Sequence, residues 1–341
     1  MFGTSMAILT SLVPPAKRGW AFGINTSAVY TSLALGPLLG GLLTQYLGWR
    51  SIFFVAGAIG IVVIAGTILV IKKEWKEAAG SKFDKWGSLL YTGGLFVLIY
   101  GFSTLPSILS FSLIAQGLFI LYCFALYERN YAFPVFNMTL LLHNRVFRLS
   151  SISALINYSA TFAVGFMLSL YLQDVRGLAP REAGLILISQ SVVMAVTSVV
   201  SGRLADKMSA SLLATSGMAI TAVGLVGLCF LTESTSFFVI VILLMLLGLG
   251  FGIFSTPNMT IIMGSVDKAY YSMASATTGT MRLTGQAFSM GIALMAISIQ
   301  MGNVQLSEAV HTQMLHSMRI VFIICSILSA LGVYMSSVRN M

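Results

Sequence analysis

The chain has 341 residues, of which 57% are hydrophobic and only 9% are charged, and its mean hydropathy is +0.92. Soluble domains carry about a quarter of charged residues, so this composition excludes a soluble globular protein. Apolar runs of roughly 20 residues recur along the whole length, which excludes both a single anchor and a β-barrel with its short alternating segments. We therefore expect an all-α polytopic membrane protein.

The net charge of +9 would point to nucleic acid in a soluble protein. In a membrane protein it is typical of loops that face the cytoplasm and anionic lipid, so we expect membrane lipid as a partner and no nucleic acid. The three cysteines lie singly in apolar runs. No nucleophile–base or metal-ligand pattern occurs, so the sequence predicts no enzyme, no metal site and no cofactor.

The first thirteen residues are apolar but too short to span a bilayer, and the string PPAKRG ends them. They lack the features of a cleavable signal peptide, and Met1 is expected to begin partway through a helix. About ten complete spans follow. They are predicted over residues 20–43, 52–71, 88–105, 108–127, 147–172, 182–201, 210–231, 237–262, 273–298 and 318–338.

The basic residues predict the orientation of these spans. If Lys17 and Arg18 lie inside, most of the other cations lie inside too. The predicted outside cations are Arg50, Arg176, Arg181 and Arg319. The asymmetry predicts a cytoplasmic C-terminus. We expect a multi-pass protein of the plasma membrane.

A weak internal repeat suggests how the chain is organised. Shifting the sequence by 251 positions pairs Thr4 with Ser255 and Lys17 with Lys268, each just before or within a cytoplasmic loop. Parallel repeats of this kind are typical of two-bundle transporters. On this pattern roughly a hundred residues, three helices and part of a fourth, would be absent from the front.

The repeat and the span pattern divide the chain into three parts. We expect residues 1–71 to be the remainder of an N-terminal helical bundle and residues 146–341 to be a C-terminal six-helix bundle. Residues 72–145 would hold a cytoplasmic linker and two extra transmembrane helices. The mixed charges of residues 72–87 are typical of a solvated amphipathic linker.

One early span carries a row of small residues at every fourth position: Ala28, Ser32, Gly36 and Gly40. Such a stripe allows a neighbouring helix to pack closely in lipid. Pro37 removes one backbone donor, so we expect the helix to bend there. The bend and the small face suggest a moving part, although small-residue stripes are also common as simple helix–helix contacts.

No Asp or Glu falls inside a predicted span. Proton-coupled transporters usually carry an intramembrane carboxylate. Either the protein is not proton-coupled, or that carboxylate belongs to a part that is not here.

Arg282 is the one ionisable residue clearly inside a predicted span, roughly 12–15 Å beyond the nearest loop. A charge at that depth needs a partner or a wet cavity, unless the side chain reaches back to the interface. The polar run around it favours a cavity wall.

Several other polar residues fall inside spans and could line a site near the membrane midplane. We also expect Pro257 to break its helix. Each of these polar residues could equally make a hydrogen bond between helices. The cavity candidates, with Arg282, are Asn157, Tyr158, Gln190, Asn258 and Gln286.

The string GRLADK contains Gly202, Arg203, Asp206 and Lys207 and closes one span on the predicted inside. Asp206 could accept hydrogen bonds from the backbone amides that start the next helix, with the two cations flanking it. Such a cluster could latch one conformation. The alternative is an ordinary basic loop with one acid.

These strings together resemble the fourteen-helix drug:proton antiporters of the major facilitator superfamily, over essentially the whole chain. The resemblance rests on GPLLGG, LGWRSIFF, GRLADK, GLGFGIFSTPN and ATTGTMRLTGQ. It matches the family's antiporter motif at Gly36, Pro37, Gly40 and Gly41, with Ser32 where a glycine is more usual. It matches the second copy of the family's loop motif at Gly202, Asp206 and Lys207.

The resemblance implies a two-bundle architecture with two extra linker helices and an incomplete N-terminal bundle. The family's helix-one carboxylate, first loop motif and helix-four arginine have no counterparts here. The implied activity is export of a drug-like, cationic or amphipathic substrate in exchange for protons, by rocking of the bundles around a midplane cavity. The alternatives are a symporter or uniporter for a small metabolite, and an incomplete chain without transport of its own.

Overall fold

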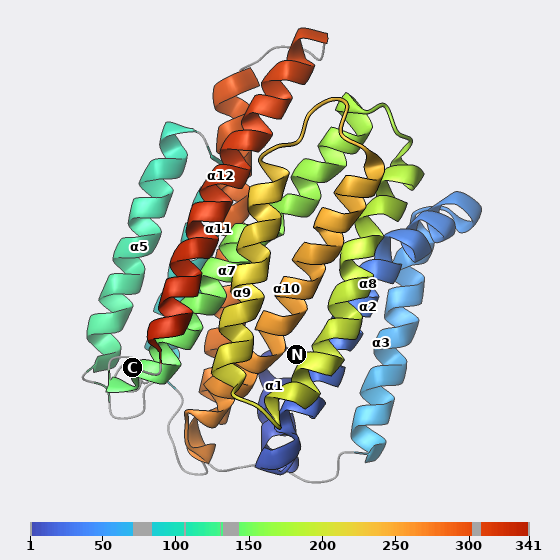
Figure 1. Cartoon of the computed structure of the whole chain (residues 1–341). Helices are drawn as coiled ribbons and strands as arrows, with labels where there is room; N and C mark the ends of the chain where they lie inside the picture. The colour runs from blue at the N-terminus through green and yellow to red at the C-terminus, as the bar shows by residue number, and fades with distance from the viewer. Residues whose placement is uncertain are drawn as a thin grey trace.

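The computed structural model describes residues 2–70, 84–105, 107–129, 131, 143–301 and 308–339. These ranges contain eleven α-helices and no strand, which confirms the all-α prediction (Figure 1). The helices are α1 Phe2–Leu12, α2 Arg18–Leu47, α3 Arg50–Val70, α4 Lys85–Ser103, α5 Ile108–Arg129, α7 Arg145–Leu170, α8 Pro180–Ala205, α9 Ala210–Leu228, α10 Phe237–Gly264, α11 Tyr271–Met301 and α12 Glu308–Val338.

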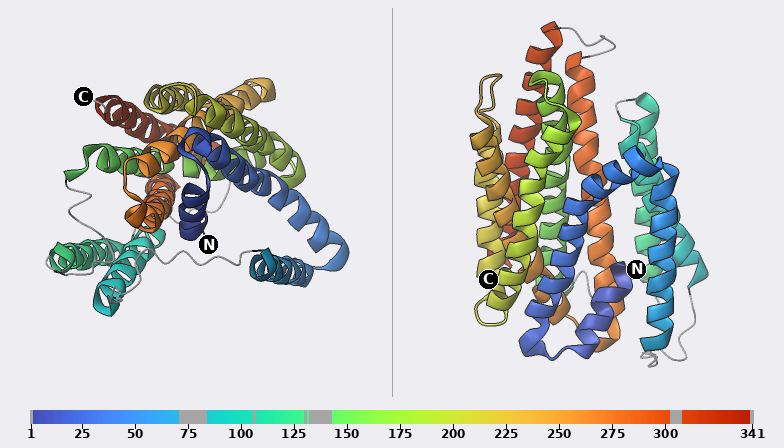
Figure 2. Two further views of the ribbon diagram at one scale, coloured as in Figure 1. Left: turned by 90° about the horizontal axis from the view of Figure 1, so that it is seen from below. Right: turned by 90° about the vertical axis from the view of Figure 1, so that its right-hand side faces the viewer.

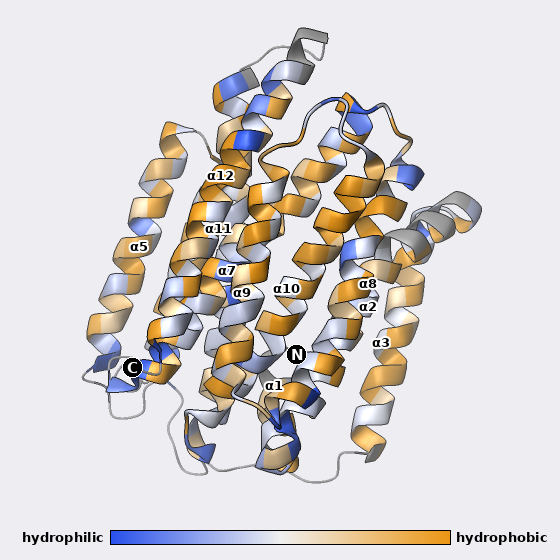
Figure 3. Cartoon of the chain, in the orientation of Figure 1, coloured by the Kyte–Doolittle hydropathy of each residue, from blue (hydrophilic) through white to orange (hydrophobic). Residues whose placement is uncertain are grey.

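Every predicted span coincides with one long helix, from α2 to α12. Eight of these helices are long and apolar enough to cross a membrane, and α2 and α4 are not among the eight. Hydrophobic residues dominate the middle of the helices, while hydrophilic ones gather near the ends (Figure 3). The distribution is that of a multi-pass membrane protein. Of the predicted linker at residues 72–87, the part up to residue 83 lies outside the described residues.

The helices α7 to α12 form one bundle, in which α7 contacts both α11 and α12. Met167 and Leu168 of α7, and Tyr171 directly after it, are fully buried in the largest core cluster. Glycines let α10 approach its neighbours closely, since a Cβ at Gly248 would lie 2.5 Å from the carbonyl oxygen of Gln190 on α8. The prediction that Pro257 breaks its helix is wrong, because α10 continues through this residue.

The tightest contact of α2 is with α8, and it lies at the start of α2. A Cβ at Gly23 would lie 2.6 Å from the carbonyl oxygen of Ser198. By contrast, a Cβ at Gly36 or Gly40 would meet no atom within 4 Å. The later half of α2 runs away from the bundle toward α3 (Figure 2), so the predicted close packing along the small-residue stripe is wrong for this conformation. The backbone of α2 stays helical through residue 37.

The helices α4 and α5 form a hairpin that leans on α11 through α4. The hydroxyls of Tyr91 and Thr280 are 2.5 Å apart, and the rings of Phe102 and Phe288 meet edge to face at 5.2 Å. The helix α3 packs against α2 and is almost entirely exposed within the described part of the chain. These helices therefore stand beside the main bundle, as the left-hand view of Figure 2 shows.

Two stretches far apart in the chain have the same local order of elements. The helix α1 is followed by a 3₁₀ turn at Pro15–Lys17 and then α2, while α10 is followed by a 3₁₀ turn at Lys268–Tyr270 and then α11. Lys17 and Lys268, which the shift of 251 positions pairs, each lie in one of these turns. We call the end of the molecule that holds Arg18, Asp206 and Arg339 the basic end, and the opposite end the far end.

Candidate functional site

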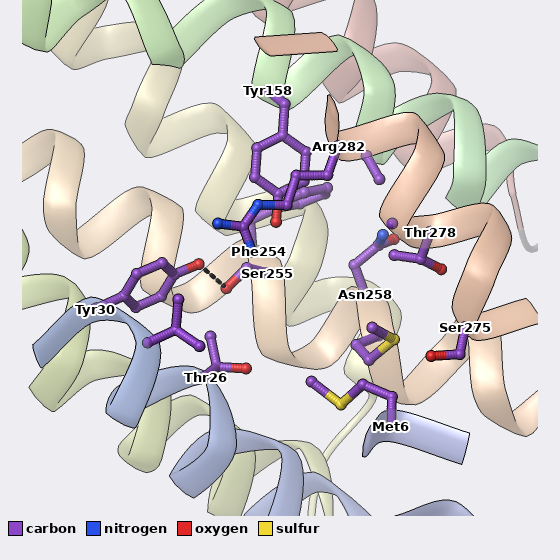
Figure 4. Close-up of a pocket in the computed structure, with 14 residues that line it drawn as sticks. Met6, Thr26, Tyr30, Tyr158, Phe254, Ser255, Asn258, Ser275, Thr278 and Arg282 are labelled. Carbon is purple, nitrogen blue, oxygen red and sulfur yellow. Dashed lines mark hydrogen bonds between the residues drawn. The ribbon is translucent and has the colours of Figure 1, made fainter. Parts of the chain in front are cut away.

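A small internal cavity lies between α1 and α2 on one side and α7, α10 and α11 on the other. Its volume is about 50 Å³, enough for a few water molecules but well below the roughly 300–1,000 Å³ of sites for drug-sized ligands. The conformation is therefore contracted around this space. Figure 4 shows polar side chains from α2, α7, α10 and α11 around it, while α1 contributes Met6. The lining polar residues are Thr26, Tyr30, Tyr158, Ser255, Asn258, Ser275, Thr278 and Arg282.

Arg282 of α11 projects into this cavity, as its sequence context predicted (Figure 4). The side chain is half-buried, and its Cζ lies 5.7 Å from the centroid of the Tyr158 ring. A guanidinium at this distance is attracted by the negative face of an aromatic ring.

Tyr30 of α2 closes one side of the cavity and was missed in the sequence. Its hydroxyl donates to Oγ of Ser255 on α10 at 3.1 Å. The ring of Phe251 meets Tyr30 edge-on at 5.8 Å and Tyr158 at 5.4 Å, so three aromatic side chains tie α2, α7 and α10 together. The only available signal was that Thr26 and Tyr30 are four residues apart and share one face of a helix.

Asn258 of α10 lines the cavity, but both the nitrogen and the oxygen of its amide form hydrogen bonds with residues outside the cavity lining. The Nδ2 group donates to the carbonyl oxygen of Ser150 at 3.1 Å. The Oδ1 atom accepts from Nη1 of Arg339 at 3.0 Å. Asn258 thus positions the cavity wall as well as forming part of it.

Arg339 follows α12 at the basic end and is 1% exposed. Besides Asn258, its guanidinium donates to Oγ of Ser150 at 3.2 Å and to Oγ of Ser211 at 3.0 Å. It therefore joins α7, α9 and α10. Burial lowers its pKa to about 10. Nothing in the local sequence indicates that this arginine is buried.

The structure does not bring the other three cavity candidates into the lining. Asn157 on α7 is fully buried, and neither atom of its amide has a hydrogen-bond partner in the described part of the chain. Gln190 is half-buried on α8, where its backbone faces Gly248. Gln286 is half-buried on α11, one turn beyond Arg282.

The GRLADK loop is fastened to α2 and not to the next helix. Asp206 accepts from the backbone N of Gly19 at 2.8 Å and from that of Trp20 at 2.9 Å. A carboxylate at a helix N-terminus is favoured by the helix dipole. The predicted partner, the start of α9, is instead capped by Ser209.

Around Asp206 the rest of the loop motif divides into a packed part and an exposed part. Gly202 is buried against Gly19 and Gly23 of α2. Arg203 and Lys207 are exposed.

A second set of hydrogen bonds is made by Arg18 and connects the starts of α2 and α11. Arg18 donates from Nη2 to the hydroxyl of Tyr271 and to the carbonyl oxygen of Thr10, both at 3.0 Å. Above it Met6 and Phe22 pack in a buried apolar cluster with residues of α7, α10 and α11. The basic end is therefore closed by hydrogen bonds and by apolar packing.

Of the predicted antiporter motif, Gly36 is exposed and Gly40 is half-exposed, both in the later half of α2. The exposure of Pro37 and Gly41 lies outside what the structure describes.

A bundle of helices long and apolar enough to cross a membrane, which encloses a small polar cavity, is typical of multi-pass membrane proteins. The sequence profile of the Major Facilitator Superfamily matches residues 1–290 and, in a second alignment, residues 150–339. The chain belongs to this superfamily, whose members are transporters and not enzymes.

Similar curated proteins are named for small-molecule transport. The riboflavin transporter RibZ of Clostridioides difficile is 26% identical over 86% of this chain and 63% of its own length. The multidrug resistance protein Stp of Mycobacterium tuberculosis is 28% identical over 85% of this chain and 54% of its own length. The tetracenomycin C resistance and export protein of Streptomyces glaucescens is 28% identical over 72% and 47%. This chain thus spans about half to two thirds of such relatives.

Proposed function

We propose that this chain forms the translocation path of an exporter that moves amphipathic small molecules by alternating access, in exchange for protons. Two relatives are named for drug resistance, and one of these names includes export. The polar cavity between α1–α2 and the α7–α12 bundle supplies a place for such a molecule at the interface of two groups of helices.

The observation that carries this proposal is the unequal contact of α2 with α8. Near Gly19 and Gly23 the two helices leave no room for a Cβ atom, and Asp206 adds two hydrogen bonds. At Gly36, in the later half of the same helix, no neighbour lies within 4 Å of a Cβ. One tightly closed end and one separated end are what one state of alternating access requires.

In the opposite state the later half of α2 would approach the α7–α12 bundle and the basic end would open. The small faces of Gly36 and Gly40 would then allow a close seal. The asymmetry of cations supports a position of the basic end and the C-terminus on the cytoplasmic side of the membrane, and we propose that this is the plasma membrane. Proton exchange is proposed by resemblance, since no Asp or Glu lines the cavity in the described part of the chain.

Efflux of an amphipathic fluorescent dye from cells that express the chain, with and without a protonophore, tests the proposal. We expect energised efflux that the protonophore abolishes. Asp206→Asn should slow it at least about fivefold, because it weakens the charge-assisted bonds that hold the basic end closed. Asp267→Asn is the matched control at the same end, since its side chain caps no helix. Absence of efflux from chain shown to be in the membrane, or equal rates in both variants, would overturn the proposal.

A second candidate is a symporter or uniporter for a small metabolite, which the similarity to a riboflavin transporter favours. It predicts counterflow of labelled riboflavin in proteoliposomes without a pH gradient. A third possibility is that the chain transports only together with further helices, because it spans about half the length of two of these relatives. Dye efflux that appears only when such helices are supplied would identify this case.

A further inference from the structure

A groove at the far end of the molecule is separate from the internal cavity, since none of its described lining residues lines that cavity. It lies between the turn that joins α9 to α10 and the neighbouring parts of α11 and α12, which extend beyond that turn (Figure 1). Its volume is about 650 Å³, within the roughly 300–1,000 Å³ of sites for small ligands. Glu233 of the turn and Thr312, His316 and Arg319 of α12 line this far-end groove.

The two walls of the far-end groove carry opposite charges. Glu233 is exposed and has no hydrogen-bond or ion-pair partner in the described part of the chain. Arg319 is also exposed, and its Nε donates to the carbonyl oxygen of Cys229 at 3.2 Å. This bond holds the guanidinium beside the end of α9 and uses only one of its five N–H groups. The groove therefore offers a carboxylate and a cation to the same ligand.

The turn that carries Glu233 is fixed by hydrogen bonds. The hydroxyl of Tyr171 donates to the carbonyl oxygen of Thr232 at 2.7 Å, and Nη1 of Arg176 donates to the carbonyl oxygen of Thr235. Within the turn, the backbone N of Thr232 donates to Oγ1 of Thr235 at 2.8 Å. A wall that is already ordered lowers the entropic cost of binding a ligand.

An apolar surface continues from the groove along α12. Thr312, His316, Arg319, Ile323 and Ile327 are three or four residues apart and therefore share one face of the helix. Below the polar part of this face, Ile323 is 44% exposed and Ile327 is 57% exposed. Because α9 ends and α10 begins beside the groove, it lies at the boundary between the apolar spans and their polar rim. A ligand with a charged head and an apolar chain matches this arrangement.

We propose that the far-end groove binds the headgroup of a membrane phospholipid that carries a primary amine. The phosphate would lie beside Arg319, whose planar guanidinium matches phosphate oxygens, and the ammonium would donate to the carboxylate of Glu233. The acyl chains would follow the exposed face of α12 past Ile323 and Ile327. A choline headgroup has no N–H to donate, and a glycerol headgroup has no cation, so both should bind more weakly. The inference does not depend on the proposed function.

Three phospholipids with identical acyl chains and ethanolamine, choline or glycerol headgroups test this site. Each is titrated into the purified, delipidated full chain in detergent, and the dissociation constant of the first bound lipid is measured by native mass spectrometry. We expect phosphatidylethanolamine to bind at least about fivefold more tightly than the other two, because it alone engages both charges.

Variants of the two charged residues assign the preference to the groove. Glu233→Gln should weaken the binding of phosphatidylethanolamine at least about fivefold and change that of phosphatidylglycerol less than about twofold. Arg319→Gln should weaken the binding of all three lipids, because they share the phosphate. The matched controls are Glu182→Gln and Arg181→Gln, which replace exposed residues at the start of α8 at the same end and should change no affinity.

Equal affinities for the three lipids, or a preference for phosphatidylethanolamine that Glu233→Gln leaves unchanged, would overturn the inference. Arg319 also contacts Cys229, so if Arg319→Gln does not fold, Glu233→Gln on the exposed turn still decides. Water-soluble O-phosphoethanolamine has the same charged groups without the acyl chains, and we expect it to displace the lipid only at a concentration at least about a hundredfold higher. Displacement at equal concentration would overturn the assignment to a lipid. The assay needs no transport, so its failure and the absence of dye efflux are separate results.

Discussion

Arg18 and Tyr271, the first residues of α2 and α11, are joined across the basic end of the molecule. Nη2 of Arg18 donates to the tyrosine hydroxyl at 3.0 Å, and its Cζ lies 5.3 Å from the centroid of the ring. The two helices therefore start from one shared contact beside the apolar cluster that closes this end.

Loss of the contact between Arg18 and Tyr271 should increase the fraction of molecules in which the basic end is open. Arg18→Gln removes the charged hydrogen bond, which is worth about 1.5–3 kcal/mol, whereas Tyr271→Phe keeps the ring contact and should have the smaller effect. The readout is labelling of Thr26→Cys in the cavity by a membrane-impermeant maleimide added from the basic side, after the three native cysteines are replaced. We expect labelling to be at least about fivefold faster in Arg18→Gln. Lys17→Gln, an exposed neighbour, is the control, and equal labelling in the two variants would contradict the prediction.

Two glycine substitutions should separate stability from transport. Gly202→Val forces a side chain into the α2–α8 contact, where overpacking costs about 1–3 kcal/mol, so the thermal unfolding midpoint in detergent should fall. Gly36→Leu meets open space and should leave this midpoint within about 1 °C. It should nevertheless abolish efflux, because it blocks the state in which the later half of α2 closes. Normal efflux by Gly36→Leu would show that this half never packs closely.

Removal of Arg339 should destabilise the fold. Arg339→Leu leaves Oδ1 of Asn258 buried without its donor and severs the links to Ser150 and Ser211, at a cost of about 2–3 kcal/mol. We expect the unfolding midpoint to fall by roughly 3–6 °C. Arg145→Leu at the same end removes an exposed arginine with a single hydrogen bond to a backbone carbonyl and should cost less than about 1 kcal/mol. Equal losses in the two variants would show that burial of Arg339 is unimportant.

The lowered pKa of Arg339 also predicts how stability depends on pH. Because burial lowers the pKa of Arg339 to about 10, the folded chain binds fewer protons than the unfolded chain between this pH and the higher pKa of an exposed arginine. Its contribution to stability therefore rises only above about pH 10 and is constant near neutrality. The difference in unfolding midpoint between the native chain and Arg339→Leu should thus be the same at pH 6 and pH 8, and a clear change would contradict this.

Two buried asparagines should respond in opposite ways to the same substitution. Asn157→Leu removes an amide with no hydrogen-bond partner, so the unfolding midpoint should stay the same or rise. Asn258→Leu removes an amide with two partners and should lower it, at a cost of about 1–3 kcal/mol. Asn157→Leu should also leave dye efflux unchanged, since this residue does not line the cavity. Lost efflux with a normal midpoint would instead return Asn157 to the transport path.

Prediction from the sequence succeeded where the physical signal is local. Hydrophobic runs long enough to span a bilayer produced every long helix, and the cost of burying a charge placed Arg282 at a cavity. It failed where a residue needed a distant partner. Asp206 was assigned to the next helix in the chain, but its partners Gly19 and Trp20 lie almost two hundred positions away.

The sequence by itself determined the class of protein, the helices and one charged cavity residue, because hydropathy and the cost of an intramembrane charge act within a single helix. Only the tertiary structure decided which glycines of α2 are in contact, that Tyr30 closes the cavity, and that Arg339 is buried against Asn258. A row of small residues permits close approach of another helix but does not specify which one, or in which conformation. That choice belongs to the packing of whole helices, in which Gly19 and Gly23 meet α8 while Gly36 meets nothing.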